Sequence, residues 1–307
     1  MLRLAHARWF RRVATGRLGW LVASRFVAGE TLDEAISVAR ALRDRGRATI
    51  LDHLGENVTE AEHAGGAARA YVRALERIRE DPGLDVSISV KLTQLGLDFS
   101  TELASDNLSR VLEAATGRVV MIDMESSDYV ERTLEVFAEL RGRTDRLGVC
   151  LQSALRRTPR DVDALPAGSI VRLVKGAYLE PSAVAFGDRR DVDRAFARLA
   201  VTLLDRGHTL HVATHDQDLL EGVRAHVERT GVPWSRADLQ FLLGVRRDLQ
   251  ARYAGAGYPV TVYVPYGTQW YPYLTRRLAE RPANMWFFLS NLVRVRRESE
   301  GWGARDG

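Results

Sequence analysis

Short apolar runs alternate with longer amphipathic segments from about residue 48 onward. Runs of this length and composition are typical of buried strands. Eight of them predict strands, at residues 47–55, 85–92, 118–124, 147–154, 169–177, 209–216, 238–244 and 259–267.

The segments between these runs carry apolar residues at helical spacing. The clearest examples lie at residues 60–80, 128–143, 191–207 and 217–231, and several end with a glycine after a basic residue, as helices often do. Strands that alternate with helices indicate a parallel sheet covered on its faces. Eight such units favour a closed (βα)8 barrel, an α/β fold, over an open doubly wound sheet. The first strand is not followed by G-x-G-x-x-G, which further weakens a dinucleotide-binding Rossmann interpretation.

The sequence contains no linker or low-complexity segment, so we expect one domain over residues 1–307. About residues 1–45 are expected to form an added helical layer, about 46–290 the barrel, and about 291–307 a C-terminal tail. A length of 307 residues suits this division, because roughly 250 residues are typical of such a barrel.

The segment after the eighth strand, YPYLTRRLAER at residues 271–281, predicts a helix with an unusual polar face. Tyr273, Arg276, Arg277 and Glu280 fall at i, i+3, i+4 and i+7 and therefore share one side of that helix. Two leucines form an apolar stripe beside them. The spacing alone does not identify what this polar face contacts.

Composition narrows the class of protein. Hydrophobic residues make up 46% of the chain and the formal net charge is +4, from basic residues that are spread along the sequence. Away from its two ends, the sequence has no compact basic block interleaved with aromatic residues, which argues against nucleic-acid binding. The single cysteine, Cys150, excludes an internal disulfide framework and suits a reducing compartment.

No run in the sequence approaches the roughly 18 apolar residues that a transmembrane helix needs. Residues 1–30 are arginine-rich and lack an uninterrupted apolar core, unlike a secretory signal. A packed helical layer is the favoured interpretation, and a membrane-surface helix or an organelle address remains the alternative. Residues 285–303 mix aromatic and basic side chains, which suggests membrane contact. We expect a cytoplasmic protein with peripheral contact at the inner face of a membrane.

Polar residues gather at the carboxyl ends of the predicted strands, where a (βα)8 barrel carries its chemistry. They are Lys91, Asp123, Gln152, Arg172, Lys175, Thr214, His215, Gln240 and Tyr263. Each also has a structural interpretation: Lys91 and Asp123 fit a simple ion pair, and His215 fits a hydrogen-bonded structural histidine. Arg172 is harder to explain in this way, because an unpaired guanidinium inside an apolar strand is costly. Several consecutive strands that end alike favour a functional site.

Other kinds of site are poorly supported. The histidines lack H-x-x-x-H or H-E-x-x-H spacing, so no metal site is expected, and no G-x-S-x-G segment indicates a serine hydrolase. Many hydrogen-bond donors and two cationic clusters suit an anionic small molecule bound beside a cofactor.

Several strings together resemble the flavin-dependent proline dehydrogenases, over about residues 30–290. These are ILDHLGE (50–56), ISVKLTQLG (88–96), IDME (122–125), RLVKGAYLEP (172–181), ATHD (213–216), QFLLG (240–244) and YVPYGTQWYPYLTRRLAERPAN (263–284). The chain length is similar to that of the monofunctional enzymes of this family. The resemblance implies a distorted (βα)8 barrel that binds FAD and whose eighth helix lies over the barrel mouth.

The resemblance also implies a set of substrate contacts. Lys91, Arg276 and Arg277 would bind the proline carboxylate, and Asp123 would support Lys91 and the amine end. Four side chains would surround the ring, namely Tyr178, Leu242, Tyr263 and Tyr273. Glu56 would pair with Arg276 as a gate over the substrate. Tyr263 favours proline over hydroxyproline, since relatives that act on hydroxyproline tend to have a smaller residue there.

Flavin contacts follow in the same way. Arg172 would lie near the reactive flavin nitrogen, and other residues would line the FAD: Met124, Gln152, Lys175, Gly176, Ala177, Thr214, His215, Gln240 and Glu280. Asp216 departs from the family, which often has asparagine there.

The implied reaction is hydride transfer from C5 of L-proline to flavin N5, which gives Δ1-pyrroline-5-carboxylate, the first step of proline catabolism to glutamate. Electrons would pass to a membrane quinone. The residues by themselves leave two alternatives: an aldolase-type barrel that forms a Schiff base at Lys91 or Lys175, and a non-catalytic amino-acid-binding protein.

Overall fold

Eight parallel strands form a closed barrel in which each strand pairs with its neighbours in sequence and β1 pairs with β8. The computed structural model describes residue 20 and residues 23–280, and of residues 276–280 only the backbone is described. The strands are β1 (Ala48–His53), β2 (Val86–Val90), β3 (Val120–Ile122), β4 (Leu147–Gln152), β5 (Ile170–Val174), β6 (Thr209–Ala213), β7 (Ala237–Leu242) and β8 (Val260–Tyr266). All eight predicted runs contain a strand, so the predicted α/β barrel is confirmed.

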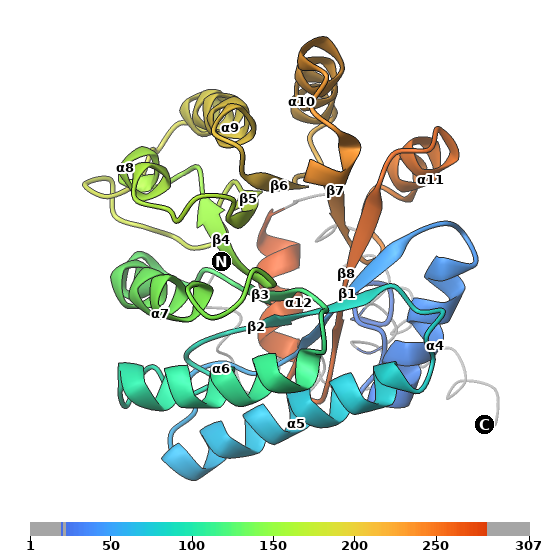
Figure 1. Ribbon diagram of the computed structural model, residues 1–307, viewed down its shortest axis with the longest axis vertical. Helices are drawn as coiled ribbons and strands as arrows, with labels where there is room; N and C mark the ends of the chain where they lie inside the picture. Colours follow the sequence, from blue (N-terminus) through green and yellow to red (C-terminus); the bar gives the residue numbers. More distant parts are fainter. Residues whose placement is uncertain (1–19, 21–22, 281–307) are drawn as a thin grey trace, which may run out of the picture.

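The helices of the barrel units surround these strands (Figure 1). They are α5 (Ala61–Arg79), α6 (Thr101–Ala115), η1 (Ser127–Tyr129) with α7 (Val130–Arg141), α8 (Thr158–Asp163), α9 (Arg189–Asp205), α10 (Gln217–Thr230), and η2 (Trp234–Arg236), followed after β7 by α11 (Arg247–Gly255). The four helical segments predicted most clearly correspond to α5, α7, α9 and α10.

The eighth barrel helix does not complete this outer ring. Helix α12 (Trp270–Glu280) follows β8 and lies across the middle of the ring (red in Figure 1), and its Tyr273 lines the cavity at the barrel mouth. Helix α4 (Leu32–Arg43), which precedes β1, packs outside the barrel against β1 and β8. Helix α4 therefore occupies the outer position that α12 leaves open. The division at about residues 45 and 290 stays a prediction.

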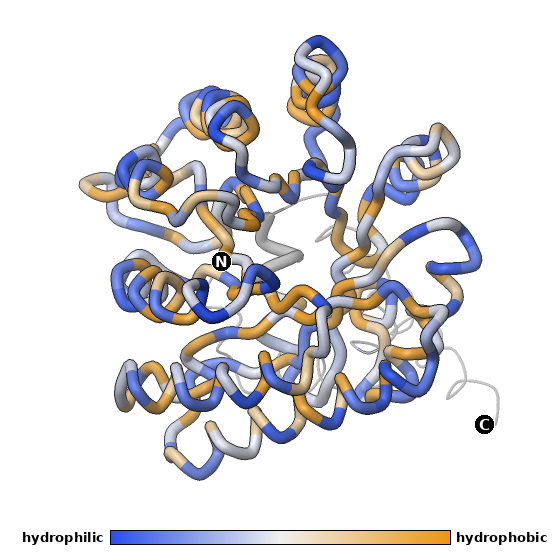
Figure 2. The backbone as a smooth tube through the Cα atoms, viewed as in Figure 1, coloured by the Kyte–Doolittle hydropathy of each residue, from blue (hydrophilic) through white to orange (hydrophobic). Residues whose placement is uncertain are grey.

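Burial explains why the strands are mostly apolar. Strand β4 is buried at every position, and one continuous hydrophobic core joins the strands to the inner faces of the helices. Figure 2 shows the same separation, with hydrophilic residues on the outer faces of the helices. Parallel strands covered by helices have no face exposed to water, so alternation of apolar and polar residues is not required.

A segment near the N-terminus packs onto α12. Phe26 and Val27 share a small hydrophobic cluster with Trp270, Tyr273 and Leu274, separate from the main core. The Trp270 indole Nε1 donates a hydrogen bond to the Glu30 carboxylate at 3.2 Å. These contacts fix the first turns of α12 over the barrel mouth.

Gly244, in the loop after β7, allows that segment to approach closely. Its φ of +77° is a conformation that other residues rarely adopt, and a Cβ there would lie 1.9 Å from the carbonyl oxygen of Arg25. Glycine is therefore required where the N-terminal segment crosses the rim of the barrel.

None of the helices in residues 20 and 23–280 combines the length and apolarity needed to cross a membrane.

Candidate active site

A cavity of about 870 Å³ opens at the carboxyl ends of the strands. Its lining includes every site residue predicted from the sequence for which a side chain is described: Glu56, Lys91, Asp123, Met124, Gln152, Arg172, Lys175, Gly176, Ala177, Tyr178, Thr214, His215, Gln240, Leu242, Tyr263 and Tyr273. A volume of this size falls within the range of small-molecule and cofactor sites. Strands that lie far apart in the sequence therefore converge on one place, as the barrel predicts.

Lys91 lies at the centre of the buried charges in this cavity. It follows β2, is 7% exposed, and its Nζ lies 2.9 Å from Asp52 Oδ1 and 3.4 Å from Asp123 Oδ2. Burial lowers the pKa of Lys91, but the two carboxylates outweigh this effect and raise the pKa above its ordinary value. Lys91 is therefore a protonated ammonium at neutral pH.

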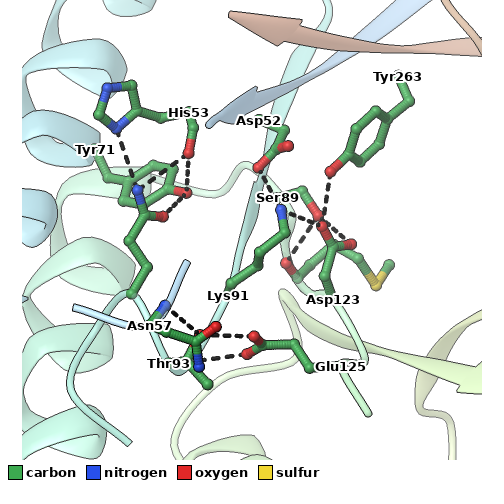
Figure 3. A network of polar contacts seen from close by, with 12 residues as sticks. Asp52, His53, Asn57, Tyr71, Ser89, Lys91, Thr93, Asp123, Glu125 and Tyr263 are labelled. Atoms are coloured by element: carbon green, nitrogen blue, oxygen red, sulfur yellow. Dashed lines mark hydrogen bonds and ion pairs between the residues drawn. The ribbon is translucent and has the colours of Figure 1, made fainter. Parts of the chain in front are cut away.

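Asp123, directly after β3, accepts hydrogen bonds from several strands at once (Figure 3). Its Oδ1 accepts from the Ser89 hydroxyl at 2.7 Å and pairs with Arg172 Nη1, and its Oδ2 accepts from the Tyr263 phenol at 2.7 Å. Burial raises the pKa of Asp123, but Lys91 and Arg172 more than offset this and hold the pKa below its ordinary range. Asp123 is consequently an ionised acceptor.

The Tyr263 phenol, on β8, stays neutral in this arrangement. Burial, followed by the charges of Asp123 and Asp52, raises the pKa of Tyr263 well above its ordinary value. The Arg172 guanidinium lies over the Tyr263 ring, with Cζ 5.3 Å from the ring centroid.

Arg172, in β5, crosses the interior of the barrel and is 3% exposed. Its Nε donates to Gln240 Oε1 at 2.8 Å on β7, and its Nη1 donates to Ser89 Oγ at 3.1 Å on β2. The third nitrogen, Nη2, is buried and has no hydrogen-bond partner among the residues that the structure describes. A buried guanidinium nitrogen without a partner is costly, so Nη2 is available for a ligand in the cavity.

The side-chain amide of Gln240 is held in place by two neighbouring side chains, Asp238 and His211. Its Nε2 donates to Asp238 Oδ2 at 2.8 Å and lies 2.9 Å from His211 Nδ1. Because the Asp238 carboxylate can only accept, the amide nitrogen lies on that side and the amide oxygen faces Arg172.

A second part of the cavity is lined by the loop that follows β5. Gly176 has a φ of +121°, and a Cβ there would lie 3.2 Å from both Ala154 Cβ and Gln152 Oε1. The loop exposes Gly176 and Ala177 at the cavity. Because Gly176 has no side chain, its backbone can pack close to Ala154 and Gln152 at the edge of the cavity.

Lys175, beside this loop, pairs with two carboxylates. Its Nζ contacts Asp193 on α9 and lies 2.9 Å from Asp216 Oδ2. Asp216 also accepts a hydrogen bond from the backbone N–H of Asp218 at 3.2 Å and so caps α10. Burial raises the pKa of Asp216, but the hydrogen bond and charge of Lys175 keep it below the ordinary range. At this position a carboxylate does more than an asparagine amide, because it partly neutralises Lys175.

His215, after β6, has a defined tautomer. Its Nε2 accepts a hydrogen bond from the backbone N–H of Leu242 at 3.1 Å. Nε2 is therefore unprotonated and Nδ1 carries the hydrogen of the neutral ring. Met124, Gln152 and Thr214 are buried and line the same cavity.

Side chains of α12 beyond residue 275 lie outside the described residues. This applies to the predicted roles of Arg276, Arg277 and Glu280, and to the predicted pairing of Glu56 with Arg276. The helix itself is present, and its Tyr273 is 6% exposed at the cavity.

Asp52 is the clearest residue to which sequence reasoning assigned no role. It is fully buried in β1 and forms the shorter of the two contacts to Lys91. Burial raises its pKa, and the Lys91 charge offsets only part of this increase. A carboxylate inside the apolar run ATILDH was the available signal, since such a group needs a cationic partner.

Comparison with known proteins agrees with this geometry. The sequence profile of the family described as proline dehydrogenase matches residues 35–289. The chain belongs to the proline dehydrogenase family. The resemblance found in the sequence motifs is thereby confirmed, and the protein is an oxidoreductase of proline catabolism.

Its relatives include proline dehydrogenases of similar length. Proline dehydrogenase 1 of Bacillus subtilis subsp. natto is 38% identical over 288 residues, which cover 93% of this chain and 94% of the relative. The proline dehydrogenase of Deinococcus radiodurans is 36% identical over 283 residues, covering 90% and 91% of the two chains.

A solved structure shows the same fold. Proline utilization A from Bdellovibrio bacteriovorus, determined after inactivation by N-propargylglycine, superposes with a TM-score of 0.78 at 25% identity over 84% of this chain. The chain spans only 32% of the length of that protein. The similarity therefore extends over about a third of the longer protein.

Proposed function

We propose that this protein oxidises L-proline to Δ1-pyrroline-5-carboxylate in the cavity at the barrel mouth, with FAD as its cofactor and a membrane quinone as electron acceptor. The observation that carries the assignment to this cavity is the buried cluster of Lys91, Asp52, Asp123 and Arg172 at the strand ends. The family is flavin-dependent, and its activity fixes the class of reaction.

The substrate carboxylate would bind beside Lys91. The Lys91 ammonium is protonated and lies between the carboxylates of Asp52 and Asp123. With Arg172 as the second cation, this cluster of two cations and two anions has no net charge of its own. An added carboxylate therefore needs further cations. Arg276 and Arg277 of α12 would supply them, because a guanidinium fork suits a carboxylate.

The amine end of proline would lie toward Asp123. Its carboxylate is ionised and is already oriented by Ser89, Arg172 and Tyr263. Tyr178, Leu242, Tyr263 and Tyr273 line the cavity and would surround the pyrrolidine ring. Such fixed contacts orient C5 and exclude water before hydride transfer.

The residues present fit FAD. The unpartnered Nη2 of Arg172 offers a buried donor, and the close backbone at Gly176 offers N–H groups beside the cavity. FAD, when bound, would supply the acceptor for the hydride that leaves C5. Residues that would hold it are Met124, Gln152, Arg172, Lys175, Gly176, Ala177, Thr214, His215, Gln240 and Glu280.

A Schiff-base aldolase is disfavoured by the charges at Lys91. An amine nucleophile must lose its proton, and Asp52 and Asp123 oppose that loss. Lys175 is likewise paired with carboxylates. Membership of the proline dehydrogenase family also disfavours a purely binding role.

The direct test is a visible absorbance spectrum of the purified protein before and after anaerobic L-proline. We expect flavin absorbance that proline bleaches and that hydroxyproline bleaches far less. A colourless protein that binds proline and reduces no dye would contradict the proposal.

A second test addresses the carboxylate contacts. Arg276→Lys and Arg277→Lys should each raise KM for proline, since a lysine cannot make a bidentate contact. An unchanged KM in both variants would remove these arginines from the substrate site. Quinone reduction in liposomes, compared with a water-soluble dye as acceptor, tests the membrane acceptor and the peripheral location.

A further inference from the structure

The loop between β1 and α5 lies at the edge of the cavity and faces α12. Its Glu56 lines the main cavity, and Leu54 to Asn57 line a smaller adjoining cavity of about 270 Å³ together with Gln269, Pro272 and Tyr273. The conformation of this loop, residues 54–60, therefore decides where Glu56 stands relative to the substrate.

Asn57 fixes the conformation of loop 54–60. Its φ of 48° is in the left-handed region, which asparagine tolerates better than most residues. The Asn57 Nδ2 donates to Asp98 Oδ2 at 3.1 Å and to the Tyr129 hydroxyl at 3.3 Å, while that hydroxyl donates to Asp98 Oδ1 at 2.7 Å. The Asn57 backbone N–H donates to Thr93 Oγ1 at 3.2 Å.

Thr93 connects Asn57 to a buried carboxylate (Figure 3). The Thr93 backbone N–H donates to Glu125 Oε1 at 3.1 Å, and the Thr93 hydroxyl donates to Glu125 Oε2 at 2.6 Å. Glu125 is 4% exposed, and its backbone carbonyl accepts from Gln152 Nε2 at 2.9 Å. Within the described residues, Glu125 forms no hydrogen bond with Lys91 or Asp123.

The hydrogen bonds that link Asn57, Thr93 and Glu125 have a required direction. The Asn57 N–H can only donate, so the Thr93 hydroxyl oxygen accepts from it and the hydroxyl hydrogen is left for Glu125. Glu125 must then accept on both oxygens, which an ionised carboxylate does. A protonated Glu125 becomes a donor on one oxygen and leaves the Thr93 hydroxyl hydrogen without its acceptor.

From this geometry we propose that Glu125 is a positioning residue for the substrate site: in its ionised form it orders Thr93 and Asn57, and thereby holds Glu56 at the cavity over bound proline. The proposal rests on the proposed function for the role of Glu56, but not for the order of loop 54–60.

The surroundings of Glu125 make this contact sensitive to pH. Burial raises the pKa of Glu125 to about 7, although the two hydrogen bonds from Thr93 and the charge of Lys91 lower it. Glu56 raises it further. The titratable groups that face Glu125 are Lys91, Glu56, Tyr71 and Tyr129. Of these, Lys91 stays protonated, and Tyr129, whose pKa the hydrogen bond to Asp98 raises to about 12, stays neutral. Loop 54–60 should accordingly be more ordered at pH 8 than at pH 6.

The first experiment measures the order of the loop without substrate. Hydrogen–deuterium exchange of peptides covering residues 54–60 is compared in the holoenzyme and in Thr93→Val, which keeps the backbone donor and the shape but removes the hydroxyl. After correction for intrinsic exchange, we expect at least fivefold faster exchange in the variant at pH 8 and no change in α9. Unchanged exchange of residues 54–60 overturns the proposal, whether or not the protein oxidises proline.

The second experiment connects the loop to ligand binding. Tetrahydrofuran-2-carboxylate resembles proline but has no amine to titrate, so its Kd can be compared at pH 6 and pH 8 by calorimetry. The wild-type holoenzyme should bind it about fivefold more tightly at pH 8, and Glu125→Gln should bind it equally at both pH values. Glu180→Gln is the matched control, because Glu180 accepts from the Ser127 N–H and hydroxyl in the same way; it should keep the wild-type pH dependence. A Glu125→Gln protein that keeps that dependence overturns the proposal.

Discussion

Lys91 and Asp52 form a buried ion pair in which Nζ lies 2.9 Å from Oδ1. Lys91 directly follows β2 and Asp52 lies in the neighbouring strand β1, and their side chains are 9% and 1% exposed. Such a pair is weak evidence for stability, because taking two charges out of water is costly. Removing one partner alone is more costly still.

Asp52→Asn should therefore lower the free energy of unfolding by about 3 kcal/mol, because Lys91 keeps only one charged partner, Asp123, at the longer of the two distances. Urea unfolding followed by circular dichroism measures this loss. Lys91→Met in the same background should recover part of the stability, since it removes the unpaired charge. Strictly additive losses in the double variant would show that the two residues are not coupled.

Arg172→Lys should lower the rate of flavin reduction by proline about 10²-fold. A lysine carries its three N–H donors on a single nitrogen, so it cannot span Gln240, Ser89 and Asp123 as the separate guanidinium nitrogens do and also present an N–H at the position of Nη2. Stopped-flow reduction without oxygen gives the rate. Arg236→Lys is the control, because Arg236 donates to the carbonyls of Leu204 and His208 and does not line the cavity. Equal effects of both substitutions would contradict a direct role for Arg172.

Gly176→Ala should reduce flavin content and destabilise the protein by about 1 to 3 kcal/mol, owing to its positive φ. The added Cβ also approaches Gln152 and Ala154 at 3.2 Å. The ratio of flavin to protein absorbance and a thermal melt measure the two effects. Gly117→Ala is the control: Gly117 has a φ of +85°, and a Cβ added there would have no atom within 4 Å. This substitution should lower stability but leave the flavin content unchanged.

Glu125→Gln should change how stability depends on pH. Because the pKa of Glu125 is raised in the fold to about 7, the native state keeps a proton that the unfolded chain releases at lower pH. Its contribution is thus favourable in acid and is lost as pH rises through about 7. Relative to wild type, Glu125→Gln should gain about 2 to 3 kcal/mol between pH 5 and pH 8. A constant difference at both pH values would mean that Glu125 titrates normally.

Much of this protein could be predicted from its sequence because the pattern is local. Strands buried on both faces read as continuous apolar runs, and the residues that follow each run must meet at one end of a parallel barrel. Arg172 and Lys91 were found in this way. The motifs KGAY and YLTRRLAE further identified the family, and the helix face with Tyr273 followed from spacing alone.

The partners of those residues depended on the tertiary structure. Asp52 reaches Lys91 only because β1 and β2 are neighbours in register. The apolar run that contains Asp52 does not indicate that its carboxylate points inward. Similarly, α4 lies between β1 and β8 on the outside while α12 covers the mouth, although both are amphipathic helices of similar length. The hydrogen bonds from Asn57 through Thr93 to Glu125 join three separate loops. The sequence determined which side chains stand at the strand ends; closure of the barrel decided which of them share hydrogen bonds, because such bonds need separations near 3 Å that periodicity along the chain cannot specify.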